Sequence, residues 1–164
     1  MTIPARITNG PERVLLENML DRNRTALIAA VGGLSEVESR RRLVTSLTTP
    51  IGLLKHAAVA ERRWFQHFLA GLPESECDGP ITPGDLSFVV SDDETVADVT
   101  ADFEQASDHS RLIAAGYSLD VTREHPIVGT VSLRWIYLGL IEDFARHAGH
   151  GDILVEQTNE RRQK

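Results

Sequence analysis

The sequence lacks a second cysteine, an excess of basic residues and a long apolar run. Its one cysteine, Cys77, excludes an internal disulfide and suits a reducing compartment. No stretch approaches the roughly 18 consecutive apolar residues of a membrane-spanning helix. The first residues, MTIPARITNGPERV, lack the basic region and apolar core of a secretory leader. We therefore expect a soluble, cytoplasmic protein without a membrane partner.

Acidic residues outnumber basic ones by 24 to 17, which gives a formal net charge of −7 and an isoelectric point near 5.3. A large nucleic-acid footprint needs a basic face to neutralise phosphates, and this balance does not supply one. The chain does have 41% hydrophobic residues in a length of 164. That content is enough to bury the core of one domain.

Apolar residues recur with a helical period in four long segments. Gly, Pro and Asp mark the connections between them. Thr49 and Pro50 have the types expected at the start of the second segment, and Ser35 and Glu38 have the capping-box spacing of a short helix. The four segments cover residues 11–31, 50–69, 95–115 and 130–158. Four amphipathic helices of this length predict an all-α four-helix bundle.

The connection at residues 70–93 is longer than a minimal bundle needs. Its Pro and Gly residues break any long helix, although LSFVV at 86–90 could pair briefly as a strand. Loops beyond about 12 to 15 residues are uncommon unless they carry function or make a crossover. We therefore expect a crossover loop that lets helices two and three lie parallel.

The last helix carries EDFARHAGHGDILVE at 142–156, in which an acidic residue and two histidines fall close together. On a helical wheel, Asp143 lies about 40° from His147 and about 20° from His150. His147 shares its angle with apolar residues and should point into the bundle. Asp143 and His147 suit a divalent metal, and they equally suit a hydrogen-bonded pair without one.

Helix two offers a further candidate ligand in His56, at the margin of its apolar arc. Glu61 lies inside that arc, where an unpaired carboxylate is costly to bury. It should therefore have a partner such as an arginine, a histidine or a water held by a metal. His67, His109 and His125 fit surface or loop positions better.

Two stretches together resemble the DinB-like superfamily, LLKHAAVAERRWF at 53–65 and VSLRWIYLGLIEDFARHAGHGDIL at 131–154. The resemblance covers nearly the whole chain and is to an actinobacterial branch related to mycothiol-dependent maleylpyruvate isomerases and bacillithiol transferases. It implies a single DinB-like four-helix bundle domain over 1–164. It also implies a divalent metal (zinc, nickel or iron) on three ligands, which fall on His56, Asp143 and His147.

The same resemblance implies a use for the metal, which would activate the thiol of a cofactor such as mycothiol for transfer or isomerisation. Glu61 and His150 would then be the catalytic groups that orient ligands or relay protons. The expected partners are a small-molecule substrate and, by analogy, a second copy of the chain in a homodimer.

Two positions depart from the pattern of the superfamily. Asp143 stands where Glu or His is usual, and Gly139 stands where close relatives tend to have His. These departures favour an alternative function, a non-catalytic, small-molecule-binding or stress-associated dimeric bundle with a degenerate metal site. The first hypothesis remains a metal-dependent thiol transferase or isomerase.

Overall fold

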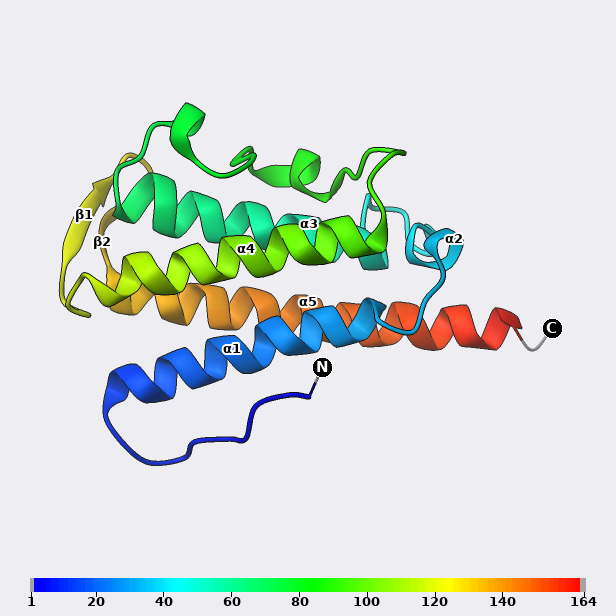
Figure 1. Ribbon diagram of the computed structural model, residues 1–164, viewed down its shortest axis with the longest axis horizontal. Coiled ribbons are helices and arrows are strands. Elements are labelled where there is room, and N and C mark those ends of the chain that lie inside the picture. Colours follow the sequence, from blue (N-terminus) through cyan, green and yellow to red (C-terminus); the bar gives the residue numbers. More distant parts are fainter. Residues whose placement is uncertain (1, 163–164) are drawn as a thin grey trace.

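Four long helices lie lengthwise against one another in the computed structural model, which describes residues 2–162 (Figure 1). α1 and α5 run in one direction, and α3 and α4 run in the other. α1 packs mainly on α5, and α3 packs mainly on α4. The helices are α1 (Glu12–Val31), α3 (Pro50–Glu61) with its π-helical continuation η1 (Arg62–Leu69), α4 (Val96–Ala115) and α5 (Leu133–Arg162). The all-α bundle and the parallel pair expected from the sequence are confirmed.

Side-chain caps set the starts of the helices close to their predicted positions. Thr49 accepts a hydrogen bond from the backbone N–H of Gly52, with Pro50 in the first turn of α3. The short helix α2 (Glu36–Ser39) has the predicted capping box of Ser35 and Glu38. Each such cap satisfies a backbone donor that the first helical turn leaves unpaired.

The crossover after η1 returns along the outside of α3 to the start of α4 (Figure 1). It holds two short 3-10 helices, η2 (Glu74–Glu76) and η3 (Gly84–Phe88). The brief strand that LSFVV could have formed is therefore not present, since residues 86–88 belong to η3. A physical reason is the close approach of this segment to α3, since a Cβ on Gly52 would lie 2.7 Å from the backbone oxygen of Phe88.

A β-hairpin that the sequence did not predict connects α4 to α5. β1 (Thr122–His125) pairs antiparallel with β2 (Gly129–Ser132), so α5 begins at Leu133 and not near Thr130. Val131 is the one buried residue of the two strands. The hairpin thus lacks the alternation of apolar and polar residues by which a strand is recognised.

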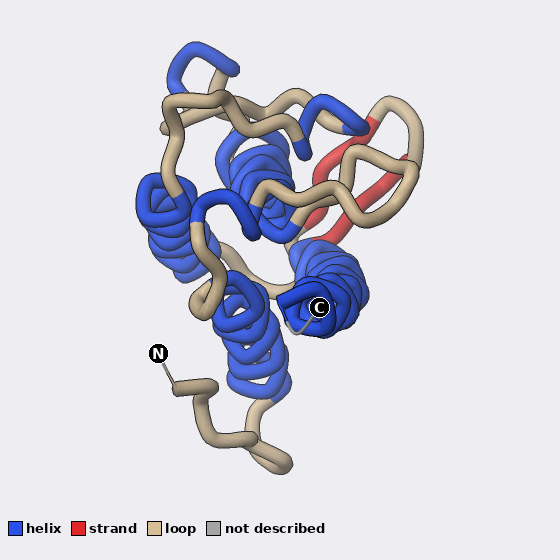
Figure 2. The backbone as a smooth tube through the Cα atoms, turned by 90° about the vertical axis from the view of Figure 1, so that its right-hand side faces the viewer, coloured by secondary structure: helices blue, strands red, loops and turns tan. Residues whose placement is uncertain are grey.

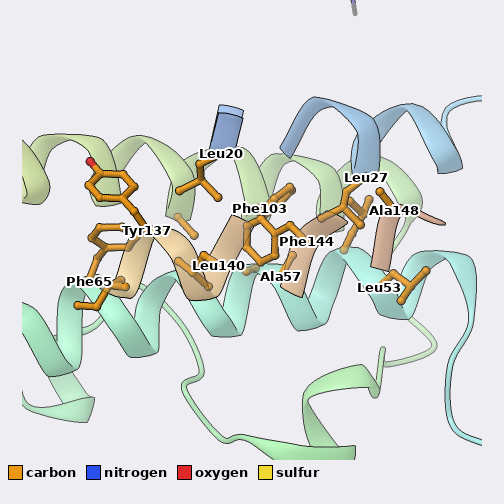
Figure 3. Close-up of a cluster of buried hydrophobic side chains, with 14 of the residues drawn as sticks. Leu20, Leu27, Leu53, Ala57, Phe65, Phe103, Tyr137, Leu140, Phe144 and Ala148 are labelled. Atoms are coloured by element: carbon orange, nitrogen blue, oxygen red, sulfur yellow. The ribbon is translucent and has the colours of Figure 1, made fainter. Parts of the chain in front are cut away.

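The hydrophobic core runs along the middle of the bundle (Figure 3). Phe103 of α4 and Phe144 of α5 meet edge to face in it, with ring centroids 5.8 Å apart. Burying each such side chain contributes about 1.5 to 3 kcal/mol. Core residues labelled in the figure are Leu20, Leu27, Leu53, Ala57, Phe65, Phe103, Tyr137, Leu140, Phe144 and Ala148.

Seen end-on, the crossover and the N-terminal segment lie on opposite sides of the bundle (Figure 2). The crossover covers the side of the bundle formed by α3, because η3 packs on that helix. Within residues 2–162, no helix combines the length and the apolar character needed to cross a membrane.

Candidate metal centre and adjoining cavity

His56 of α3 converges with Asp143 and His147 of α5 on one point of the bundle. One potential ligand atom from each residue lies within 4.8 Å of the other two. Asp143 is central, because its Oδ2 is 3.3 Å from His56 Nε2 and its Oδ1 is 3.3 Å from His147 Nε2. The three residues that the sequence proposed as ligands are therefore brought together.

The spacing of these atoms suits a single divalent cation. Two donor atoms that are each about 2.1 Å from a tetrahedral ion lie about 3.4 Å from each other. The two distances of 3.3 Å, each to a different oxygen of Asp143, are close to that value, and one donor atom from each of the three residues lies within 4.8 Å of the others. Two imidazole nitrogens and one carboxylate are also a donor set that zinc, nickel and iron accept. The residues present therefore fit the metal that the resemblance implied.

Ser87 and Phe88 of the crossover hold the ring of His56. The Ser87 hydroxyl donates its one proton to the Gly84 carbonyl at 2.5 Å, and its oxygen lies 2.8 Å from His56 Nδ1. That oxygen must then accept a hydrogen bond from Nδ1–H, which leaves the Nε2 lone pair facing Asp143. Phe88 stacks on the imidazole with ring centroids 4.2 Å apart. Hydrogen bonding and stacking together fix the tautomer and the ring plane.

The electrostatics of Asp143 also favour a cation. Burial would raise the pKa of its carboxyl, but hydrogen bonds with His147 and His56 outweigh burial and lower the pKa far below its ordinary value. Asp143 is thus a carboxylate at neutral pH. With Nδ1–H given to Ser87, the hydrogen bond from His56 to Asp143 needs a second proton on Nε2, and a cation held between the same two atoms would take the place of that proton.

A cavity of about 400 Å³ opens beside the three residues. His56 and Asp143 form part of its wall, together with Trp64, Trp135 and Gly139. A Cβ on Gly139 would make only ordinary contact with the Trp135 ring, at 3.7 Å. The cavity gives a small molecule access to two of the three candidate ligands.

Comparison with protein families decides the assignment. Residues 15–160 match the model of the family described as Mycothiol-S-transferase, and this segment includes all three candidate ligands. The chain belongs to the mycothiol-S-transferase family. This family is part of the DinB-like superfamily, so the resemblance of the sequence is confirmed. A comparison with curated proteins finds no match.

In this member of the mycothiol-S-transferase family, Glu61 has the arginine partner that its buried position required. Its two carboxylate oxygens accept hydrogen bonds from Arg24 Nε and Nη2 at 2.7 and 2.8 Å. Both side chains are almost wholly buried, with 0% and 5% of their surface exposed. The pair joins α1 to α3, and the catalytic role of Glu61 stays a prediction.

His150 is exposed at the edge of the site. Its Nδ1 lies 3.4 Å from His147 Nδ1, on the side of that ring away from Asp143. His67, His109 and His125 lie outside the group of three that could share an ion among residues 2–162. His109 instead contacts Asp78 of the crossover at 2.6 Å.

Sequence reasoning missed four residues of the site in this family member, namely Ser87, Phe88 and the two tryptophans. Each tryptophan is eight residues from a candidate ligand, Trp64 from His56 and Trp135 from Asp143. Eight residues correspond to about 80° of rotation and about 12 Å of rise along a helix, so this spacing alone gave no signal that would place either ring on the cavity wall.

Proposed function

We propose that this chain is a metal-dependent transferase that joins a small thiol of the mycothiol type to an electrophilic acceptor. The observation that carries the proposal is the convergence of His56, Asp143 and His147 beside the cavity. Membership of the mycothiol-S-transferase family supports the thiol and the class of reaction.

A divalent ion held by these residues would favour the thiolate form of a bound thiol at neutral pH. The residues set the charge of the centre, because two neutral imidazoles and one carboxylate leave a net charge of +1. That charge attracts an anionic sulfur. The side chain of Asp143 is shorter than that of Glu. It still suffices here, because the Nε2 atoms of both histidines lie 3.3 Å from its oxygens.

We assign different roles to the two remaining residues proposed from the sequence. His150 orients His147, since the Nδ1 atoms of the two rings are 3.4 Å apart. Glu61 serves the fold, because both of its oxygens are held by Arg24. This division leaves the reacting centre to His56, Asp143 and His147.

A thiol-conjugation assay tests the proposal. The purified chain is incubated with mycothiol and monochlorobimane, and the fluorescent conjugate is measured against the uncatalysed rate. In the balanced reaction a C–S bond forms, chloride leaves and the thiol proton passes to solvent. We expect metal-dependent conjugation that a chelator abolishes and that His56→Ala lacks.

Glutathione and cysteine serve as comparison thiols in the same assay. A rate no higher than the uncatalysed one with all three thiols, in protein shown to hold metal, would refute the transferase. It would favour the alternative of a non-catalytic binding bundle, which the substitutions at Gly139 and Asp143 suggested.

A further inference from the structure

A second cavity of about 390 Å³ adjoins the first. The two share Arg63, Trp64 and Pro83 as a common wall. The rest of the second cavity is lined largely by apolar side chains or planar rings, which include Phe68, Ile81, His125 and Pro126. A molecule lying in the second cavity would therefore reach the candidate metal centre past Trp64.

The shared wall carries a cation without a partner. Within residues 2–162, the guanidinium of Arg63 makes no hydrogen bond or ion pair, although the residue is half-buried. Its neighbour Arg62 is fully buried and is paired with Asp78 and Asp102. Arg146, on the wall of the first cavity, pairs with Glu142. Among these arginines, Arg63 is the one whose five donors are available to a ligand.

Aromatic rings surround Trp64, which lies on the same shared wall as Arg63. Phe68 meets Trp64 edge to face, with ring centroids 5.5 Å apart. His125 stacks on Trp64 at 5.7 Å and 30°, and Trp135 approaches it at 5.3 Å. Glu74 is the one acidic residue on the wall of the second cavity, and it is exposed. An anion is thus favoured at Arg63, and a flat apolar body is favoured beyond it.

We propose that the second cavity is the acceptor subsite and that Arg63 binds a carboxylate on a flat, apolar acceptor. Its place in the reaction depends on the proposed function, since the reacting carbon must meet the sulfur in the first cavity. The binding of the carboxylate itself does not depend on the reaction. A planar guanidinium favours carboxylate because it can donate two parallel hydrogen bonds to it.

Tryptophan fluorescence tests the proposal directly. Trp64 and Trp135 are the two tryptophans of the chain, and both line the first cavity. The protein is titrated with 4-nitrobenzoate, which quenches indole emission, and with the neutral isostere 4-nitrobenzamide. We expect the carboxylate to bind more tightly, and Arg63→Gln to weaken its binding by about tenfold with that of the amide unchanged. Arg63→Lys should retain part of the selectivity.

Arg41→Gln is the matched control, because Arg41 is also half-buried but lines neither cavity. It should bind both probes as the unaltered chain does. Equal affinity of the unaltered chain for the two probes, no binding of 4-nitrobenzoate, or unchanged binding in Arg63→Gln would each overturn the proposal.

Metal content measured on the same preparations separates this inference from the proposed function. A chain that holds no metal but shows Arg63-dependent selectivity for the carboxylate refutes the transferase and keeps the anion subsite. A chain that holds metal and conjugates mycothiol, with no effect of Arg63→Gln on either probe, refutes the subsite alone.

Discussion

At the scale of single residues, the Ser87 hydroxyl decides which nitrogen of His56 faces the candidate centre. Its proton is committed to the Gly84 carbonyl, and only 2% of the Ser87 surface is exposed, so water does not compete. Metal-binding histidines commonly donate their other N–H to such a group, which fixes the tautomer and the ring orientation. Ser87 is thus a positioning residue.

Ser87→Ala should weaken metal binding by about 10-fold or more, because His56 loses the acceptor that fixes its tautomer. Affinity is measured by competition with a fluorescent chelator. Ser110→Ala is the control, since Ser110 is equally buried and its hydroxyl bonds to the Ala106 carbonyl within α4. Equal affinities of the two variants would show that Ser87 does not position His56.

The Arg24–Glu61 pair is predicted to stabilise the fold and to take no part in metal binding. Arg24→Met leaves a buried carboxylate unpaired and should lower the free energy of unfolding by about 3 to 5 kcal/mol. The double variant Arg24→Met/Glu61→Leu should recover most of that loss and should bind metal normally. Chemical denaturation and metal analysis check the two parts. Loss of metal from the folded double variant would show that the Arg24–Glu61 pair does contribute to metal binding.

At the scale of elements, two helices carry the candidate centre, and their glycines differ in what surrounds them. Gly139 of α5 faces the cavity, where a Cβ would meet the Trp135 ring at 3.7 Å. Gly52 of α3 lies under the crossover, where a Cβ would come within 2.7 Å of the Phe88 backbone oxygen. The same substitution should therefore have opposite effects in the two helices.

Gly139→Ala should raise the free energy of unfolding by up to about 1 kcal/mol, because alanine is the better helix former and finds room. For a chain of this length, that corresponds to a rise in the melting temperature of about 2 to 4 °C. Gly52→Ala should lower the melting temperature, since backbone atoms of the crossover must move. Calorimetry of both variants checks the pair, and a lower melting temperature for Gly139→Ala would contradict the account.

At the scale of the whole molecule, ion pairs hold the crossover against the bundle. Arg62 Nε donates to Asp78 at 2.6 Å, and Gln66 donates to the same oxygen at 2.8 Å. Burial would raise the pKa of Asp78, but the hydrogen bonds with Arg62 and Gln66 outweigh burial and lower it. The link therefore depends on an ionised Asp78.

Stability should fall in acid for this reason. A carboxyl whose pKa is lowered by folding stabilises the protein fully above its unfolded-state pKa of about 4. That contribution is lost as the pH falls through the lowered pKa of the folded state. Denaturant titrations between about pH 2.5 and 6 should show this decline, and Asp78→Asn should show a shallower one. Identical slopes would exclude Asp78 as a source of the acid sensitivity.

The four helices were predictable from the sequence because their signals are local. The apolar period and the cap at Thr49 depend on residues a few positions apart, as does the capping box of the short helix α2. The pairing of Asp143 with His147 was predictable for the same reason, as one turn of helix separates them. The wheel of the second helix made His56 a candidate, but only the resemblance to a family joined it to the other two, because no local pattern connects α3 with α5.

The remaining parts of the site depend on contacts between distant segments. Ser87 is 31 residues from His56 and lies in a loop without a period, so nothing local places its hydroxyl against that imidazole. The hairpin was missed because its strands are mostly exposed. The homodimer expected by analogy has no counterpart in a single chain and stays a prediction.

Metal analysis of the untagged protein tests the central claim most directly. The account predicts close to one equivalent of zinc, nickel or iron in the unaltered chain, and its loss in His56→Ala, Asp143→Ala and His147→Ala. Circular dichroism confirms that each variant is folded, and Arg41→Gln should keep the metal. Negligible metal in the folded, unaltered chain after incubation with all three ions, or equal metal in the unaltered chain and the three alanine variants, would contradict the account.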